Sequence, residues 1–267
     1  MKSDRSDIKE KLQKYNEEIS TYIRPSTFPL AIKMVLSLDG SDPKIKRPRR
    51  QLNLNFFLCQ AIGIARRQGW SILLDKEDIS CPSALFYLGL AKPPSSYWEG
   101  KFIFAPFNQT EEARARRSRS FSFFQLNKYK GILISPLFRA DFEPDLILVY
   151  GNPAQMMRFV QASVFKRGSA LKFSAQGGGS CAFEVVWPIL KNQVRLVLPG
   201  NGERIFGMIQ DDEMVFSIPY KKMEETIAFL RETHQGGQRF PVPVYGQFTP
   251  QLPSDYRRLL KTIRKGK

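Results

Sequence analysis

The chain has 267 residues, 42% of them hydrophobic and 12% aromatic, so it has enough apolar material for a large core and does not have the composition of a disordered protein. Its 41 lysines and arginines outnumber its 25 acidic residues, and the resulting net charge of +16 is compatible with an anionic ligand or a polyanion as partner. No apolar run is long enough to span a bilayer and the charged N-terminus is not a secretory signal, so we expect a cytoplasmic protein without a transmembrane segment.

The first part of the chain predicts an N-terminal helix followed by mixed elements. Residues 4–23 carry apolar side chains three and four positions apart among charged ones, which indicates an amphipathic helix. Pro25 and Pro29 then break it, because a proline disfavours helix in the residue before it. The other segments predicted up to residue 130 are a strand at 30–38, a basic connector at 44–50, a helix at 51–67 closed by Gly69, a strand at 70–74, and helices at 81–90 and 111–124.

The second part alternates strands and helices more regularly. Its predicted strands are 131–137, 145–150, 170–173, 194–198 and 214–218, its predicted helices are 152–165, 180–190 and 221–233, and residues 201–203 form a predicted turn. This alternation predicts an α/β (or α+β) fold: a single compact domain, with a mixed sheet, flanking helices and an N-terminal helical arm. We divide the chain into the arm at 1–23, the α/β domain at 24–250, and a basic tail at 251–267 that is a helix or a frayed end.

Two of the three cysteines stand at predicted helix starts. Cys81 and Cys181 each follow a serine and open a helix, where free N–H groups and the helix dipole favour the thiolate that binds metals and attacks electrophiles. Cys59 lies inside a more apolar helix, and no Cys-x-x-Cys pair is present. Two interpretations remain open: three thiolates that share an iron–sulfur cluster or a soft metal, and three buried cysteines that act as small hydrophobic residues.

A glycine-rich run leads into the helix of Cys181. Gly177, Gly178, Gly179 and Ser180 can expose backbone N–H groups to an anion at a helix N-terminus. The run lacks both the ending of a P-loop and the glycine spacing of a dinucleotide fold, so a flexible connector is the alternative. The stretch 201–204 has the same ambiguity, with a hairpin turn as its plainer interpretation.

A cysteine nucleophile is a third interpretation of the thiols. Such a nucleophile needs a base, and the only histidine, His234, is distant in sequence. Glu184 lies one turn after Cys181 on the same helix face, where a carboxylate would raise the pKa of the thiol and weaken the nucleophile.

Two basic clusters favour a nucleic-acid interpretation. One is the connector at 44–50, and the other lies at 114–119 and is followed by Phe121, Phe123 and Phe124. Arginines interleaved with aromatic residues can follow a phosphate backbone and stack on bases. An ordinary amphipathic segment has the same pattern, and no established nucleic-acid-binding motif is present.

Several short motifs follow one another in a recognisable order. They are the segment 24–33, Cys59-Gln60-Ala61 with Ala65-Arg66, Ser80-Cys81-Pro82 with Leu88-Gly89, the segments 142–145 and 150–158, and Ser180-Cys181-Ala182. Together they resemble the bacterial and archaeal family known as domain of unknown function 169, over residues 22–230. The resemblance implies that all three cysteines occupy motif positions, and it implies no activity.

From these observations we expect a cytoplasmic cofactor-binding protein whose Cys59, Cys81 and Cys181 converge as thiolate ligands of an iron–sulfur cluster or soft metal. The turn at 177–180 would let the backbone approach the bound group. Arg66, two turns after Cys59 on one helix face, would supply a counter-charge. The alternatives are a basic nucleic-acid-binding module with structural cysteines and a cysteine-nucleophile enzyme.

Overall fold

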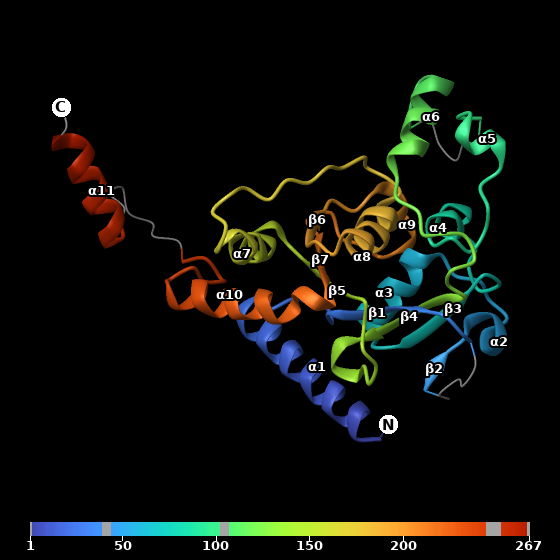
Figure 1. The fold of residues 1–267 in the computed structure, drawn as a ribbon, viewed down its shortest axis with the longest axis horizontal. Coiled ribbons are helices and arrows are strands. Elements are labelled where there is room, and N and C mark those ends of the chain that lie inside the picture. The colour runs from blue at the N-terminus through green and yellow to red at the C-terminus, as the bar shows by residue number, and fades with distance from the viewer. Residues whose placement is uncertain (1, 39–43, 102–106, 244–251, 266–267) are drawn as a thin grey trace.

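The structure, a computed structural model, describes residues 2–38, 44–101, 107–243 and 252–265, with side chains from Arg5 onward. A seven-stranded mixed sheet has the order β2-β3-β4-β1-β5-β7-β6, and helices flank it (Figure 1). The predicted fold class is therefore confirmed. The strands are β1 (Leu30–Val35), β2 (Ile45–Lys46), β3 (Ser71–Asp75), β4 (Gly131–Pro136), β5 (Leu146–Gly151), β6 (Arg195–Val197) and β7 (Met214–Pro219).

The α-helices connect the strands and cover both faces of the sheet. They are α1 (Lys2–Tyr22), α2 (Pro48–Leu52), α3 (Leu58–Gln68), α4 (Pro82–Tyr87), α5 (Ser95–Trp98), α6 (Glu111–Ser120), α7 (Pro153–Val164), α8 (Trp187–Lys191), α9 (Asn201–Phe206), α10 (Met223–Gln235) and α11 (Ser254–Lys265). Two short 3-10 helices, η1 (Leu137–Arg139) and η3 (Tyr220–Lys222), follow β4 and β7, and a π-helix, η2 (Ala182–Val186), precedes α8. Among these described elements, no helix is long and apolar enough to cross a membrane.

Strand β1 is the centre of the sheet. It pairs antiparallel with β4 along its whole length and with β5 at Leu30–Ile32. Strands β4 and β5 are buried at every position, as expected for strands that are covered on both faces and read as continuous apolar runs. The molecule is thus a three-layer sandwich, with helices on both faces of one sheet.

Each face of the sheet carries its own hydrophobic core. On one face Ile32, Leu148 and Val215 pack against α3, α4 and η2. On the other face Ala31, Ile147 and Phe216 pack against α1, α7 and α10. Successive residues of β1 and β5 therefore belong to opposite cores, because side chains alternate along a strand. The predicted N-terminal helix is confirmed, and its apolar face lies in the second core.

Several predicted boundaries are wrong for identifiable reasons. The helix predicted at 51–67 is divided into α2 and α3, because Asn53 takes a left-handed conformation (φ 52°) that ends α2. The predicted strand at 170–173 is not formed, and the predicted turn at 201–203 is the first turn of α9. The helix predicted at 180–190 contains the π-helix η2, which ends two residues before Pro188, a residue that cannot donate the usual backbone hydrogen bond. The boundary predicted between residues 250 and 251 lies outside the described residues.

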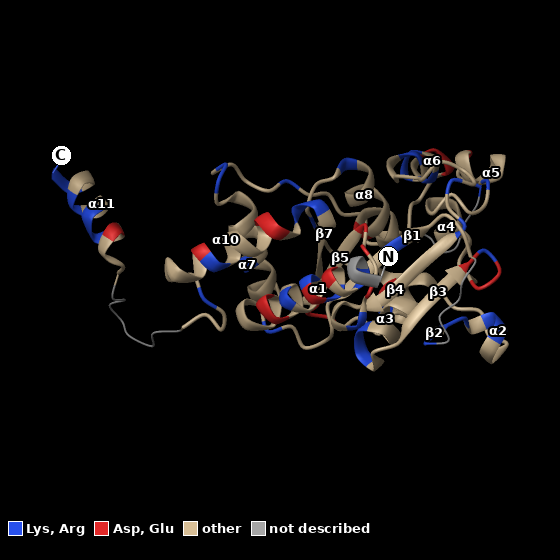
Figure 2. Cartoon of the chain, turned by 60° about the horizontal axis from the view of Figure 1, so that its bottom comes forward, with Lys and Arg blue, Asp and Glu red and all other residues tan. Residues whose placement is uncertain are grey.

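Lysines and arginines are spread over many elements, and some of them are structural. Figure 2 shows them on α1, α6, α10 and α11. Arg47, in the predicted basic connector, is buried and forms ion pairs with Asp75 and Asp78. A buried guanidinium in such a pair is unavailable to a polyanion, so not every one of the 41 lysines and arginines belongs to the basic surface.

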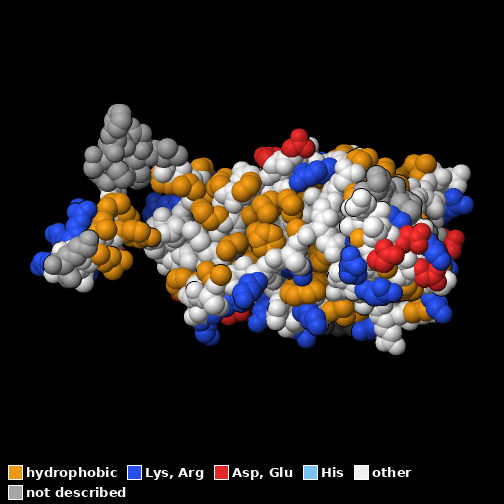
Figure 3. Space-filling view, turned by 90° about the horizontal axis from the view of Figure 1, so that it is seen from above, with side chains coloured by type: hydrophobic (Ala, Val, Ile, Leu, Met, Phe, Trp, Pro, Cys, Tyr) orange, Lys and Arg blue, Asp and Glu red, His pale blue; other side chains and the backbone are white. Residues whose placement is uncertain are grey.

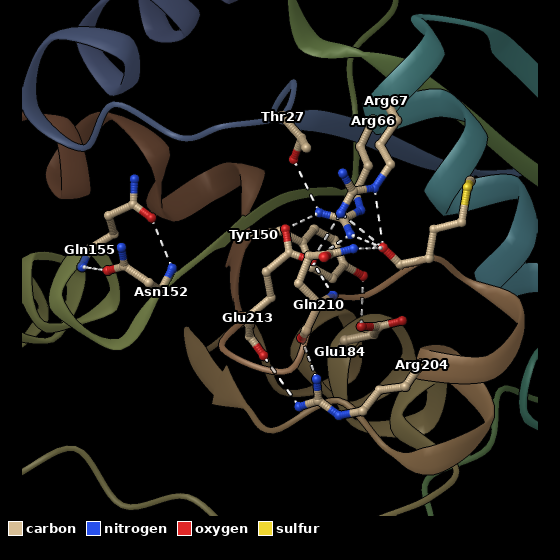
Figure 4. A network of polar contacts seen from close by, with 11 residues as sticks. Thr27, Arg66, Arg67, Tyr150, Asn152, Gln155, Glu184, Arg204, Gln210 and Glu213 are labelled. Carbon is tan, nitrogen blue, oxygen red and sulfur yellow. Dashed lines mark hydrogen bonds and ion pairs between the residues drawn. The ribbon is translucent and has the colours of Figure 1, made fainter.

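A buried ion pair joins α3 to the segment before β7 (Figure 4). Both carboxylate oxygens of Glu213 accept hydrogen bonds of 2.7 Å from the guanidinium of Arg66, which is fully buried. Burial alone would raise the pKa of Glu213, but the hydrogen bonds from Arg66 and from the N–H of Gln210 outweigh it, and the pKa is lowered. The guanidinium of Arg66 also lies 4.4 Å from the ring centroid of Tyr150. Because both charges are desolvated, neither can lose its partner without a large cost.

We expect Glu213→Gln to lower the free energy of unfolding by about 3 kcal/mol or more, because it leaves the Arg66 charge buried without its counter-charge. Urea unfolding at neutral pH measures this. Glu225→Gln is the matched control: Glu225 forms an exposed pair with Lys222 at 3.7 Å, and its loss should change stability by less than about 1 kcal/mol. Equal effects of the two variants would contradict the importance of the Arg66–Glu213 pair.

Candidate functional site

A cavity of about 430 Å³ lies between α3, α4, α6, α9 and the glycine turn before η2. Its walls are mainly apolar and rich in aromatic rings. Phe57 and Phe206 stack at 4.2 Å on one side, and Tyr87 and Phe121 pack at 5.0 Å on another. Its polar lining comes from Arg114 and Arg117 of α6, Glu203 of α9, and a set of smaller groups that includes Ser83, Ser118, Ser180 and Asn201. A cavity with apolar walls and few convergent polar groups is typical of a site for a small organic molecule.

All three cysteines line this cavity, but they do not form a metal site. Cys59 comes from the first turn of α3, Cys81 precedes α4, and Cys181 precedes η2. Over the described ranges of the chain, no group of three or more His, Cys, Asp or Glu side chains is placed to hold a metal ion. The fold thus brings three distant segments to one cavity without clustering their sulfurs as ligands. The prediction of an iron–sulfur cluster or soft-metal site on these cysteines is wrong.

The cysteines are thiols, contrary to the thiolates expected at helix starts. Burial raises the pKa of Cys59 and Cys181, and the nearby carboxyls of Glu203 and Glu184 raise it further. Burial also raises the pKa of Cys81, although hydrogen bonds from the backbone of Ala84 and Ser83 act in the opposite direction. The helix-start effect is therefore present at Cys81 but weaker than desolvation. As expected from the sequence, the carboxyl group of Glu184 raises the pKa of Cys181.

Two buried glutamates interact with each other: Glu203, which lines the cavity, and Glu184, which does not. Glu184 is fully buried, Glu203 is nearly so, and their carboxyl groups hydrogen bond with each other. Glu184 also accepts a 3.0 Å hydrogen bond from the hydroxyl of Tyr150, and Glu203 accepts from the N–H of Gly200 at 2.6 Å. Burial raises the pKa of both, that of Glu184 well above its usual value. Of the two, Glu184 has the more strongly raised pKa, so it is the member that binds a proton first as the pH falls.

The glycine turn is built by close backbone packing. Gly177 and Gly179 have φ values of +66° and +67°, which favour glycine. A Cβ on Gly179 would lie 2.7 Å from the Phe121 ring, and one on Gly200 would lie 2.5 Å from the Cα of Gly178. Gly178, Gly179 and Ser180 line the cavity, whereas Gly177 accepts a hydrogen bond from the N–H of Asn201 outside it. The turn is thus a packed wall and not a loose connector, and its role in binding stays a prediction.

Two cations of α6, Arg114 and Arg117, line the cavity, and they differ in their hydrogen-bond partners. The guanidinium of Arg117 lies 4.4 Å from the ring centroid of Phe107 and 5.6 Å from that of Phe121, and its Nε donates to the side chain of Gln176 at 3.2 Å. No carboxylate of the described chain forms an ion pair with it. Arg114, by contrast, donates to backbone carbonyls, among them that of Gly100 at 2.7 Å. Arg117 therefore keeps its electrostatic capacity for a ligand.

Arg66, predicted as a counter-charge to the bound group, is not among the residues that line the cavity. It stands behind the cavity, where it pairs with Glu213 and lies over Tyr150 (Figure 4). The phenylalanines that follow the basic cluster are also turned inward: Phe121 and Phe124 are buried, and Phe123 is partly buried in the core. They are not placed to stack on bases, so the nucleic-acid interpretation loses the aromatic platform on which it depended.

The sequence interpretation missed several residues of this site. Glu203 fell in a predicted turn, and Tyr150 is an ordinary strand residue in the sequence. The spacing of Gly200 and Glu203, three residues apart after a strand, is the start signal of a short helix and was the available clue. Arg117 was one of four arginines in a cluster, and only the tertiary contacts distinguish it from its neighbours.

The fold and the cavity together define a three-layer α/β/α protein with a thiol-lined, aromatic-walled site. The sequence model of the family described as "Uncharacterised ArCR", domain of unknown function 169, matches residues 18–228. The chain belongs to this family. It is also similar to "Uncharacterized protein MJ0308" of Methanocaldococcus jannaschii, with 24% identity over 179 residues that cover 66% of this chain and 77% of that protein. The search of solved structures gave no match.

We expect the cysteines to react slowly with iodoacetamide, because the thiolate is the reactive form and burial disfavours it. At about pH 7.5, Cys59 in the folded protein should react more than about tenfold more slowly than in the urea-unfolded chain, as followed by mass spectrometry of the labelled peptides. Cys81 and Cys181 should also react more slowly in the folded protein than in the unfolded chain. Rapid labelling of one of the three in the folded protein would instead favour a cysteine nucleophile.

We also expect the Glu184–Glu203 pair to make the protein less stable as the pH rises. A carboxyl whose pKa is raised by folding binds more protons in the folded state, so its contribution is full below its unfolded pKa and is lost as the pH rises through the folded value. Glu184→Gln keeps a hydrogen-bond donor toward Glu203 but cannot ionise, so its unfolding free energy should fall less between about pH 5 and about pH 8 than that of the wild type.

The control for this comparison is Glu77→Gln, which changes an exposed carboxylate. Glu77→Gln should show the same pH dependence of stability as the wild type, because both proteins keep the Glu184–Glu203 pair. A wild-type slope in Glu184→Gln would show that Glu184 is not the proton-holding member of the pair.

Proposed function

We propose that the protein binds a small, flat, largely apolar molecule that carries a negative group, in the cavity between α3, α4, α6 and α9. The observation that carries this proposal is Arg117, a partly buried guanidinium at an apolar cavity that forms no ion pair with a carboxylate of the described chain. A charge in such a position is costly without a partner, and a ligand anion would provide one.

The shape of the cavity supports a flat ligand. Stacked and tilted aromatic pairs on two sides offer ring faces to a planar molecule, and such contacts stabilise it beyond the burial of its area. Because the lining is mainly apolar, the body of the ligand is expected to be apolar as well, with its negative group near α6.

The electrostatics of the inner wall also support an anionic ligand. Two ionised glutamates and three thiolates would repel any anion, but the raised pKa values keep the thiols neutral and leave the Glu184–Glu203 pair with at most one charge. That remaining charge on Glu203 is directed toward the N–H of Gly200 and the hydroxyl of Ser180. The positive charges of Arg114 and Arg117 therefore dominate the cavity near α6.

A fluorescent dye with this chemistry tests the proposal. 8-Anilinonaphthalene-1-sulfonate combines a flat, apolar naphthalene ring with a negative sulfonate, and we expect the folded protein to bind it in the cavity. Arg117→Met keeps the apolar contacts with Phe107 and Phe121 but removes the charge, so it should weaken dye binding by about tenfold or more. Binding of the uncharged dye N-phenyl-1-naphthylamine should be unchanged by the same substitution.

Two further variants make the result specific. Arg119→Met removes an exposed charge from the same helix and should leave binding of both dyes unchanged. Ser83→Trp places a large ring in the cavity and should abolish binding of both dyes, provided that thermal unfolding shows an intact fold. Equal effects of Arg117→Met and Arg119→Met on the anionic dye, or no effect of Ser83→Trp, would refute the proposal.

A further inference from the structure

Helix α11 stands apart from the rest of the molecule. It has 12 residues and none of them is buried. Figures 1 and 2 both show it at one end of the molecule, away from the sheet and its covering helices. Tyr256 is 64% exposed, and Leu259 and Ile263 are each 58% exposed, so these three apolar side chains are not covered by the described chain, whereas Leu260 is partly buried.

The side chains of α11 are sorted around the helix. At about 100° per residue, its apolar side chains fall within an arc of about 100°, and its cations fall within an adjoining arc of about 120°. Figure 3 shows both kinds on the helix, with hydrophobic atoms in orange and Lys and Arg atoms in blue. The apolar side chains are Tyr256, Leu259, Leu260 and Ile263, and the cations are Arg257, Arg258, Lys261, Arg264 and Lys265.

From this arrangement we propose that α11 binds in the plane of an anionic membrane surface. The apolar stripe would enter the boundary between headgroups and acyl chains, and the cations would contact lipid phosphates. The membrane surface would then contact both the apolar side chains and the cations of α11 at the same time. Tyr256 suits this position, because its ring is apolar and its hydroxyl can remain among the headgroups. At 12 residues the helix is too short to cross the bilayer, so it lies on the surface.

The charges on α11 favour an anionic membrane over two other partners, a nucleic acid and a second copy of the chain. A nucleic acid would pair with the cations but leave the apolar stripe in water. A second copy of the chain would cover the stripe, but it would bring another five cations against the first five, with only Asp255 on each helix to offset them. The chain as a whole carries +16, which adds long-range attraction to an anionic lipid surface. This proposal is independent of the ligand proposed for the cavity.

Vesicle flotation with the full-length protein tests the proposal. We expect binding to vesicles that contain phosphatidylglycerol and phosphatidylcholine, and little binding to phosphatidylcholine alone, at an ionic strength of about 0.15 M. Leu259→Gln with Ile263→Gln removes the centre of the stripe without changing the charge, and should weaken binding by about tenfold or more. The matched control, Leu36→Gln with Leu54→Gln, changes two exposed leucines of the globular body and should bind as the wild type does.

A second pair of variants tests the charged arc. Arg257→Gln with Lys261→Gln should weaken binding to the anionic vesicles by about tenfold or more, whereas Lys166→Gln with Arg167→Gln removes the same charge from an exposed site elsewhere and should have a smaller effect. Because α11 buries no residue, the substitutions in it should leave the thermal unfolding of the body unchanged.

Three results would overturn the proposal. The first is equal binding of the wild type and the Leu259/Ile263 variant to anionic vesicles. The second is no vesicle binding by the wild type. The third is a wild-type dimer in analytical ultracentrifugation that the same double substitution dissociates, since the stripe would then be covered by a second copy of the chain.

Discussion

The shape of the cavity depends on the buried ion pair between Arg66 and Glu213. A fully desolvated guanidinium has to keep its carboxylate, so the pair fixes α3 against the segment that runs from α9 to β7. The same two elements carry cavity residues at their other ends, Cys59 on α3 and Glu203 on α9. The backbone of α3 also packs closely against this segment, since a Cβ on Gly63 would lie 2.4 Å from the carbonyl oxygen of Gly207. The pair is outside the cavity, yet it joins two segments that both contribute side chains to it.

Desolvation then decides the chemistry of the cavity. Three cysteines and two glutamates near one another would ordinarily suggest several negative charges or a bound cation. Burial instead favours the neutral forms, because it raises the pKa of the thiols and of both glutamates. The Coulomb effects of the acidic groups on one another act in the same direction. The cavity is therefore a weakly polar chamber whose cations, Arg114 and Arg117, both come from α6.

The excess positive charge of the chain serves different purposes in different places. Arg47 and Arg66 are internal and compensated by carboxylates. Arg117 faces the cavity, and the cations of α11 face solvent beside an apolar stripe. A net charge calculated from composition counts all these groups together, although only Arg117 and the cations of α11 are placed to attract a partner. Each has a different partner chemistry, because Arg117 stands among aromatic rings and the cations of α11 lie on an exposed helix.

The sequence by itself determined the local elements, the mixed α/β class and the family, since these depend on periodicity, turn residues and short motifs along the chain. It located most strands within one or two residues, but it missed α9 and placed a strand at 170–173, where local pattern is ambiguous. It also singled out the three cysteines and the glycine turn, and the structure brings the cysteines and Gly178, Gly179 and Ser180 to one cavity. Only the tertiary structure decided what these residues are chemically. Protonation depends on burial and on neighbours from distant segments, and that is why the helix-start rule gave thiolates where the folded protein has thiols.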